Sequence, residues 1–260
     1  MSQSYSKLSK IKNNITNRWR KSWIVFVLPV WVAASFYIAQ SILIGVVELL
    51  IASHIPLYSL NKSILNTIFS TLLYVVTLLL VSVLPMVIKN QNTNKKEIGL
   101  DRLPSWTDIL ITPAGLVIYL ILSSLLMLLM THLFTWIDVK QIQDTGFDHL
   151  SQYYEYILAF VTLVIVAPIV EEILFRGYMY GRLKKFLPVW SAIVITSVLF
   201  GLFHGSWVLA IDTFSLSVVL CLLREITGSL WASILLHMTK NGIAFYILFI
   251  NPLLLTTIVK

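Results

Sequence analysis

The stretch YILAFVTLVIVAPIVEEILF, residues 156–175, decides what kind of protein this is. It begins with an uncharged apolar run of about fifteen residues, and runs of roughly 18 apolar residues can cross the hydrocarbon core of a bilayer. Two adjacent glutamates, Glu171 and Glu172, follow within the same predicted helix. Ionisable residues inside a membrane helix are costly and mark functional sites by default. The stretch therefore predicts a membrane span that carries a polar site.

The rest of the chain has the same character. Of its 260 residues, 58% are hydrophobic and 12% are charged, whereas about a quarter of the residues in soluble domains are charged. Six more apolar runs occupy residues 23–52, 64–88, 108–136, 189–203, 208–223 and 230–250. The predicted fold is all-α, a polytopic transmembrane bundle of about seven (seven to eight) helices.

Four segments follow from this pattern. They are a basic N-terminal segment, 1–22, three accessory transmembrane helices, 23–154, a core of four transmembrane helices, 155–250, and a C-terminal tail, 251–260. The lone cysteine, Cys221, lies in an apolar run, so no disulfide framework and no Cys-type zinc site is expected.

The net charge of +7 could suggest a nucleic-acid partner, but its distribution indicates membrane lipid instead. Lysine and arginine gather in the N-terminal segment, in the 89–107 loop and at 182–185, while the 53–63 and 137–155 loops carry few. Because basic loops stay in the cytoplasm, this alternation predicts a multi-pass protein of the cell membrane with a cytoplasmic N-terminus.

The first polar element is the motif Glu171-Glu172-Ile-Leu-Phe-Arg176. Glu172 and Arg176 are spaced i, i+4 and can form an ion pair along one helix face. Glu171 points about 100° away from Glu172 and stays available as a base. Pro168, three residues earlier, removes a backbone hydrogen bond and is expected to kink the helix beside the site.

Two further polar elements follow on later helices. Phe200-Gly-Leu-Phe-His204 ends the fifth run, and His237-Met-Thr-Lys-Asn241 lies in the seventh, with His237 and Asn241 on one face. A rise of ~1.5 Å per residue places all three elements ~12–24 Å from the cytoplasmic ends of their helices. They can therefore line one cavity, near mid-membrane and reachable from the cytoplasm.

Such a cavity can activate water. A carboxylate in a low-dielectric pocket suits a general base, an imidazole can share the proton, and an amide can donate to an oxyanion. The same residues, Glu171, His204 and His237, could instead hold a divalent metal such as zinc with one position open for water. The residue pattern fits both uses.

With these elements in order, residues 155–250 resemble the CAAX protease and bacteriocin-processing family of intramembrane endopeptidases, which includes the type II CAAX prenyl endopeptidases. The family signature is Glu-Glu-x-x-x-Arg, Phe-x-x-x-His and His-x-x-x-Asn on successive core helices, and every signature residue is present here. The resemblance implies hydrolysis of a peptide bond in a protein or peptide substrate, which is lipidated in the prenyl endopeptidases.

The resemblance also implies roles. Glu171 and His204 would activate the water, His237 and Asn241 would stabilise the oxyanion, and Glu172 and Arg176 would support them.

The alternatives are a non-catalytic bacteriocin-immunity or scaffold protein that keeps the family fold and, ranked last, a proton-coupled transporter. Lys240 is expected to be an ion-paired or snorkelling side chain. Asp212 is expected to be solvated near a helix end.

Overall fold

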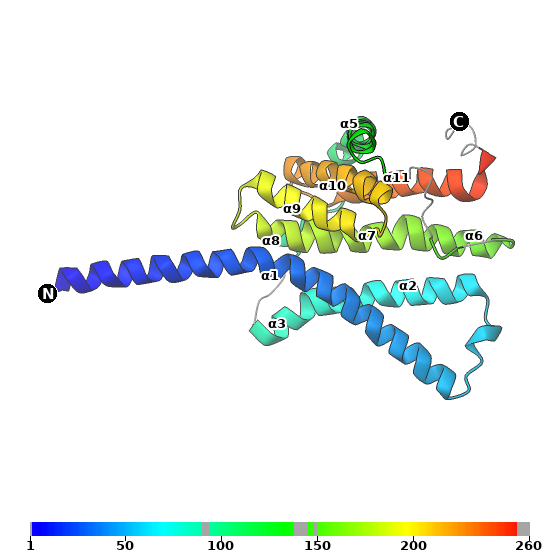
Figure 1. Ribbon diagram of the computed structural model, residues 1–260, viewed down its shortest axis with the longest axis horizontal. Coiled ribbons are helices and arrows are strands. Elements are labelled where there is room, and N and C mark those ends of the chain that lie inside the picture. Colours follow the sequence, from blue (N-terminus) through cyan, green and yellow to red (C-terminus); the bar gives the residue numbers. More distant parts are fainter. Residues whose placement is uncertain (1, 90–93, 138–144, 148–149, 254–260) are drawn as a thin grey trace.

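The fourth apolar run forms the central helix of the computed structural model (Figure 1), which extends from Tyr153 to Leu183. It alternates α-helical and π-helical stretches: α6 (Tyr153–Phe160), η3 (Val161–Val166), α7 (Ala167–Glu172), η4 (Ile173–Tyr180) and α8 (Gly181–Leu183). The structure describes residues 2–89, 94–137, 145–147 and 150–253, with the side chains of residues 2–24, 58, 88 and 89 left out.

One side of the central helix is covered by the N-terminal hairpin (Figure 1). Its helices are α1 (Ser2–Ala52), η1 (Leu57–Ser59), α2 (Lys62–Leu78), η2 (Leu79–Val83) and α3 (Leu84–Lys89). The side chain of Asn61 begins α2 by accepting hydrogen bonds from the backbone N–H groups of Ser63 and Ile64. Residues 2–22 of the basic segment continue into the first span as one helix, without a break in the backbone of residues 2–52.

The other side is covered by the C-terminal helices (Figure 1). They are α9 (Val189–Leu202), α10 (Trp207–Thr227), α11 (Trp231–Phe245) and η5 (Tyr246–Ile250). Helix α10 ends at Gly228, whose φ of 66° is the left-handed conformation that favours glycine. Of the predicted tail, 251–260, residues 254–260 lie outside the described residues.

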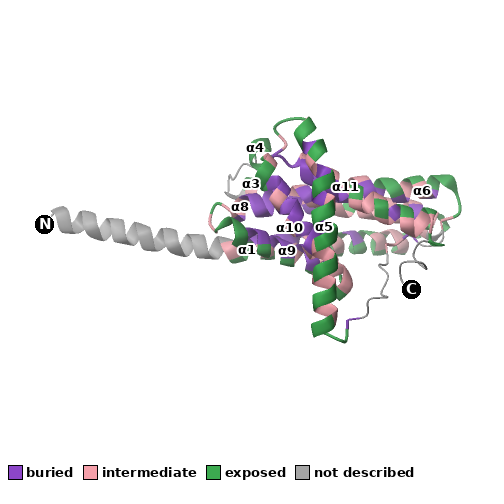
Figure 2. Ribbon diagram, turned by 90° about the horizontal axis from the view of Figure 1, so that it is seen from above, coloured by how far each residue is buried: buried purple, intermediate pink, exposed green. Residues whose placement is uncertain are grey.

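Helix α5 (Trp106–Leu133) lies outermost and packs on α10 and α11. It is seen nearly end-on in Figure 1 and lengthwise in Figure 2, so it crosses the bundle steeply. Ser105 and Asp108 form a capping box at its start, and the short helix α4 (Lys95–Ile98) precedes it.

The fold prediction is confirmed. All seven apolar runs form helices, and six of these are long and apolar enough to cross a membrane. The remaining helix, α9, formed by the run 189–203, has 14 residues. Its length is ~21 Å, whereas the hydrocarbon core is ~30 Å thick. The chain is therefore a multi-pass membrane protein in which α9 ends partway through the bundle.

The loops predicted to be cytoplasmic gather at one end of the bundle. Lys185, which follows the central helix, donates a hydrogen bond of 2.6 Å from Nζ to Glu97 Oε1 in the 89–107 loop. The backbone N–H of Leu230, before α11, donates to Gly99 O at 2.9 Å. The same loop thus contacts the ends of two core helices.

The loops predicted to be external meet at the opposite end. Asn61 Nδ2 donates to Glu155 Oε1 at 2.6 Å, which joins the start of α2 to the start of α6. Other acidic residues of the external loop, Asp138, Asp144 and Asp148, lie outside the described residues. The described parts of the two sets of loops thus lie at opposite ends of the bundle, and the assignment of one end to the cytoplasm stays a prediction.

Buried residues concentrate where the central helix meets α9 and the inner face of α1 (Figure 2). This core includes Tyr180, Phe200 and Cys221, each at most 1% exposed. Cys221 is a buried free thiol, as the sequence predicts. The core holds the polar elements in fixed positions.

Candidate active site

Glu172 is the centre of the buried charges. Its Oε1 accepts a hydrogen bond from Arg176 Nη1 at 2.8 Å and another from His237 Nδ1 at 2.8 Å. Glu172 and Arg176 are fully buried, and His237 is 3% exposed. The predicted i, i+4 pair is confirmed and extended by a histidine from α11. Because a carboxylate accepts, His237 Nδ1 carries the proton.

Glu171 points away from this pair. Its Oε1 accepts a hydrogen bond of 2.7 Å from the Tyr74 hydroxyl of α2, and its Oε2 lies 3.8 Å from His237 Nε2. Its side chain is 18% exposed, whereas that of Glu172 is fully buried. The two adjacent carboxylates therefore contact opposite nitrogens of one imidazole, and the carboxylate of Glu171 remains accessible.

His204 lies in the turn after α9. Its Nδ1 contacts the backbone oxygen of Phe200, one helical turn earlier, at 2.8 Å. A carbonyl oxygen can only accept, so Nδ1 carries the hydrogen and Nε2 is left as an acceptor. The four-residue spacing of this motif thus lets the histidine satisfy a carbonyl at the end of its own helix.

The α9–α10 turn is tight because of two glycines. Gly205 has a φ of 74°, and Ser206 starts α10 by accepting a hydrogen bond from the N–H of Leu209. A Cβ on Gly201 would lie 2.7 Å from the backbone oxygen of Ala210. Gly201 therefore lets α10 pass close to α9.

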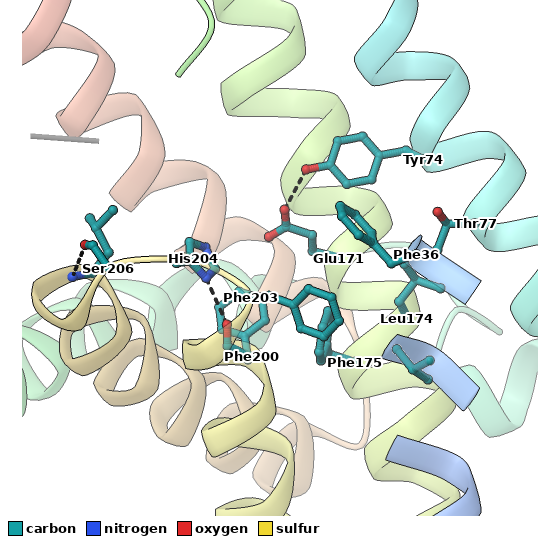
Figure 3. Close-up of a pocket in the computed structure, with 13 residues that line it drawn as sticks. Phe36, Tyr74, Thr77, Glu171, Leu174, Phe175, Phe200, Phe203, His204 and Ser206 are labelled. Atoms are coloured by element: carbon teal, nitrogen blue, oxygen red, sulfur yellow. Dashed lines mark hydrogen bonds between the residues drawn. The ribbon is translucent and has the colours of Figure 1, made fainter. Parts of the chain in front are cut away.

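A cavity of about 470 Å³ opens between the N-terminal hairpin and the core (Figure 3). Glu171 and His204 both point into it from separate elements. Its lining residues are Val32, Phe36, Tyr74, Thr77, Glu171, Leu174, Phe175, Phe200, Phe203, His204, Gly205, Ser206 and Leu209. The cavity therefore combines a carboxylate, an imidazole and hydroxyl groups with an aromatic wall.

The Asn241 side chain forms its hydrogen bond away from the cavity. Its Nδ2 donates to the backbone oxygen of Leu163 in η3 at 2.9 Å. In a π-helix each N–H bonds to the fifth residue before it, as Ala167 does to Thr162. The donor for Leu163 would be Pro168, which has no N–H. Asn241 thus satisfies the carbonyl that the proline leaves free, and the cavity lining does not include it.

The zinc alternative stays a prediction. Within the described part of the chain, no three His, Cys, Asp or Glu side chains are grouped to hold a metal ion. His237, one of the three candidate ligands, donates from Nδ1 to Glu172, which leaves its Nε2 toward Glu171 Oε2, at 3.8 Å. A His–Glu–His zinc site would need both imidazoles and the carboxylate within about 2 Å of one ion.

A second polar cluster lies between α5, α10 and α11, and we call it the Asp212 cluster. Asp212 Oδ1 accepts from the Tyr119 hydroxyl at 2.6 Å and from Ser123 Oγ at 2.7 Å. Its Oδ2 lies 3.4 Å from Lys240 Nζ. The ion-paired state predicted for Lys240 is confirmed. The expectation that solvent satisfies Asp212 was wrong, since α5 packs over α10 and supplies two hydroxyl groups.

Tyr74 is the site residue that the sequence did not indicate. It lies in an apolar run and has no spacing relation to the three motifs. The available signal was a lone tyrosine in the middle of a membrane helix, where a buried hydroxyl usually finds a partner.

Comparison with known proteins identifies the core segment. Residues 153–243 match the family model described as Type II CAAX prenyl endopeptidase Rce1-like. Searches of the curated proteins and of the solved structures give no match. The matched segment holds all three motifs, which are the ones that converge around the cavity and the central helix. Residues 153–243 are thus similar to the type II CAAX prenyl endopeptidases, the family that the three motifs predict.

Proposed function

We propose that this protein is an intramembrane endopeptidase in which Glu171 is the general base for a hydrolytic water. The observation that carries the proposal is that Glu171 and His204 face one cavity from separate helices. The cavity volume of about 470 Å³ far exceeds the ~30 Å³ that one water occupies. It can therefore hold a water together with a segment of peptide.

The proposed reaction begins with a water between these two side chains. His204 Nε2 accepts one hydrogen bond from the water, and Glu171 takes its other proton as the oxygen attacks the peptide carbonyl carbon. The carbonyl electron pair moves to oxygen and returns as the C–N bond breaks. Glu171 then gives its proton to the leaving nitrogen, so each turnover restores the carboxylate.

We assign Glu172, Arg176 and His237 to the support of Glu171. The support for this assignment is that one Glu172 oxygen holds both the guanidinium and the imidazole. His237 Nε2 then faces Glu171 at 3.8 Å. An oxyanion role for His237 and Asn241 stays a prediction, since Asn241 Nδ2 is bonded to a backbone carbonyl.

We propose a glutamate mechanism rather than a metal-assisted one. The donor arrangement supports this choice, because no three His, Cys, Asp or Glu side chains of the described residues are grouped to hold a metal ion. Every proton transfer in the scheme uses Glu171, and the ring of His204 only orients the water.

We propose a membrane-borne peptide substrate, and prenylated C-terminal peptides are the first candidates because of the family match. The aromatic side chains Phe36, Phe175 and Phe203 give the cavity an apolar wall suited to such a chain. We also propose a cytoplasmic N-terminus, which the basic loops support.

The test uses the full chain in lipid vesicles with a quenched fluorescent farnesylated peptide that ends in a Cys-a-a-X sequence. Glu171→Gln is expected to lower kcat by about 100- to 10,000-fold, the range for loss of a general base. Glu48→Gln, an exposed glutamate on α1, is the matched control and is expected to cleave normally. Cleavage by Glu171→Gln at the wild-type rate would overturn the proposal.

Chelator treatment distinguishes the mechanisms. Activity of the wild-type protein is expected to survive removal of divalent metals. A folded wild-type chain that cleaves neither prenylated nor unprenylated peptides would favour the non-catalytic immunity or scaffold role.

A further inference from the structure

Tyr74 contacts the proposed base from outside the family segment. Its hydroxyl donates to Glu171 Oε1 at 2.7 Å, and its ring lines the same cavity (Figure 3). Tyr74 lies on α2, far along the sequence from the matched residues, 153–243. The contact therefore joins the N-terminal hairpin to the reacting side chain.

The hydrogen bond limits how the Glu171 carboxylate can turn. Oε1 is held by the phenol of α2, and Oε2 is left near His237 Nε2, at 3.8 Å. Without the phenol, the carboxylate could rotate about its terminal bond, since such torsions are broad. A fixed carboxylate keeps Oε2 available to the water in the cavity.

The surroundings of Tyr74 suit a positioning role. Its ring packs against the largest buried core, and Thr77, one turn later on α2, also lines the cavity. Thr77 directs its own hydroxyl to Leu73 O at 2.7 Å, within α2. Of these two hydroxyls on α2, the one on Tyr74 is directed at Glu171.

We propose that Tyr74 is a positioning residue for Glu171, so that helix α2 completes the active site that the core segment 153–243 supplies. This inference rests on the proposed function of Glu171 as the base. It means that the N-terminal helices belong to the catalytic unit, whereas the sequence indicated only accessory spans.

The test compares Tyr74→Phe with Tyr119→Phe in the full chain. Both changes remove a hydroxyl that donates to a partly buried carboxylate, at 2.7 Å in one case and 2.6 Å in the other. Only the first hydroxyl of this pair contacts Glu171. The two variants thus separate a specific effect on the base from the general cost of losing a buried hydrogen bond.

The first readout is the infrared carboxylate spectrum of chains isotope-labelled at glutamate, with Glu171→Gln used to assign the Glu171 band. Tyr74→Phe is expected to shift that band, because a hydrogen bond from a phenol changes carboxylate stretching. Tyr119→Phe is expected to leave it in place. An unshifted band in Tyr74→Phe would overturn the inference, whether or not the peptide is cleaved.

The second readout is cleavage of the farnesylated fluorescent peptide. Tyr74→Phe is expected to lower kcat by about 10- to 100-fold through misplacement of the base, with KM nearly unchanged. Unchanged kcat in Tyr74→Phe beside an inactive Glu171→Gln would refute the positioning role and leave the proposed function standing. Full activity in Glu171→Gln would refute the proposed function itself.

Discussion

Two buried polar clusters lie in the same helical bundle and are built in opposite ways. Around Glu172, one carboxylate oxygen holds two cationic or protonated partners, and three buried atoms have no protein partner among the described residues: Glu172 Oε2, Arg176 Nε and Arg176 Nη2. In the Asp212 cluster, two hydroxyls and an ammonium surround one carboxylate, and none of its side-chain atoms is left buried without a partner.

The difference distinguishes a cluster beside the proposed active site from a cluster that attaches helices to one another. The Glu172 cluster lies beside a cavity and keeps an arginine fully buried, which is tolerable only while its counter-charge is present. The Asp212 cluster joins α5 to α10 and α11, and its charged side chains are about one-fifth exposed. Under the proposed function, ionisable residues at membrane depth thus serve reactivity in one place and helix attachment in the other.

The largest expected effect comes from Glu172→Ala. This change leaves Arg176 and His237 buried without their carboxylate, and breaking a buried pair in this way costs about 3–5 kcal/mol. We expect a large drop in the free energy of unfolding, measured by denaturant titration of the purified protein in detergent. Arg176→Met with Glu172→Gln, which removes both charges, is the control and should recover part of the loss. A stable Glu172→Ala protein would remove the distinction between the clusters.

A smaller effect is expected from Asp212→Asn. The amide keeps an oxygen for Tyr119 and Ser123, and Lys240 can extend toward the lipid headgroups. Interhelical hydrogen bonds in membrane proteins contribute about 0.6–1.7 kcal/mol, so we expect a loss of that size with cleavage of the farnesylated peptide retained. The same denaturant titration and peptide assay measure both quantities. Loss of cleavage in a folded Asp212→Asn protein would make this cluster part of the site.

The smallest effect is expected outside the membrane spans, at the Lys185–Glu97 pair. The hydrogen bond from Lys185 holds the pKa of the Glu97 carboxyl below its ordinary value of 4.5. A lowered folded-state pKa means that the pair stabilises the fold above pH 4.5 and that this contribution is lost as the pH falls through the lowered pKa. Exposed pairs contribute about 0.2–1 kcal/mol.

Thermal melting below pH 4.5 measures this effect. Lys185→Met is the control, because without the ammonium the melting temperature should lose less on acidification than in the wild type. Equal acid sensitivity in both proteins would show that the pair contributes nothing.

The sequence predicted relations that lie within one helix. The apolar runs and the Glu172–Arg176 spacing both follow from local periodicity, and both are present. The four-residue spacing of Phe200 and His204 also has a local cause, because His204 Nδ1 contacts the backbone oxygen of Phe200.

The contacts between helices could not be predicted in the same way. The hydrogen bond from Asn241 to Leu163 O depends on a π-helical register that the sequence does not reveal. In that register the Leu163 carbonyl would accept from residue 168, and Pro168 has no N–H. Tyr74 and Tyr119 are both lone tyrosines in apolar helices, and packing alone decides that one contacts Glu171 and the other Asp212. Motif spacing carries no information about such partners.

The short helix α9 also has a consequence for the surrounding lipid. One stripe of α9 faces outward, with Trp190, Val194, Val198 and Leu202 between 45% and 65% exposed. That stripe covers ~18 Å along the helix, well under the ~30 Å thickness of the hydrocarbon core. Acyl chains beside it must compress or bend, at a modest cost per Å of mismatch. We therefore expect the bilayer to be thinner next to the turn that carries His204, which would bring headgroups and their water toward the depth of the cavity.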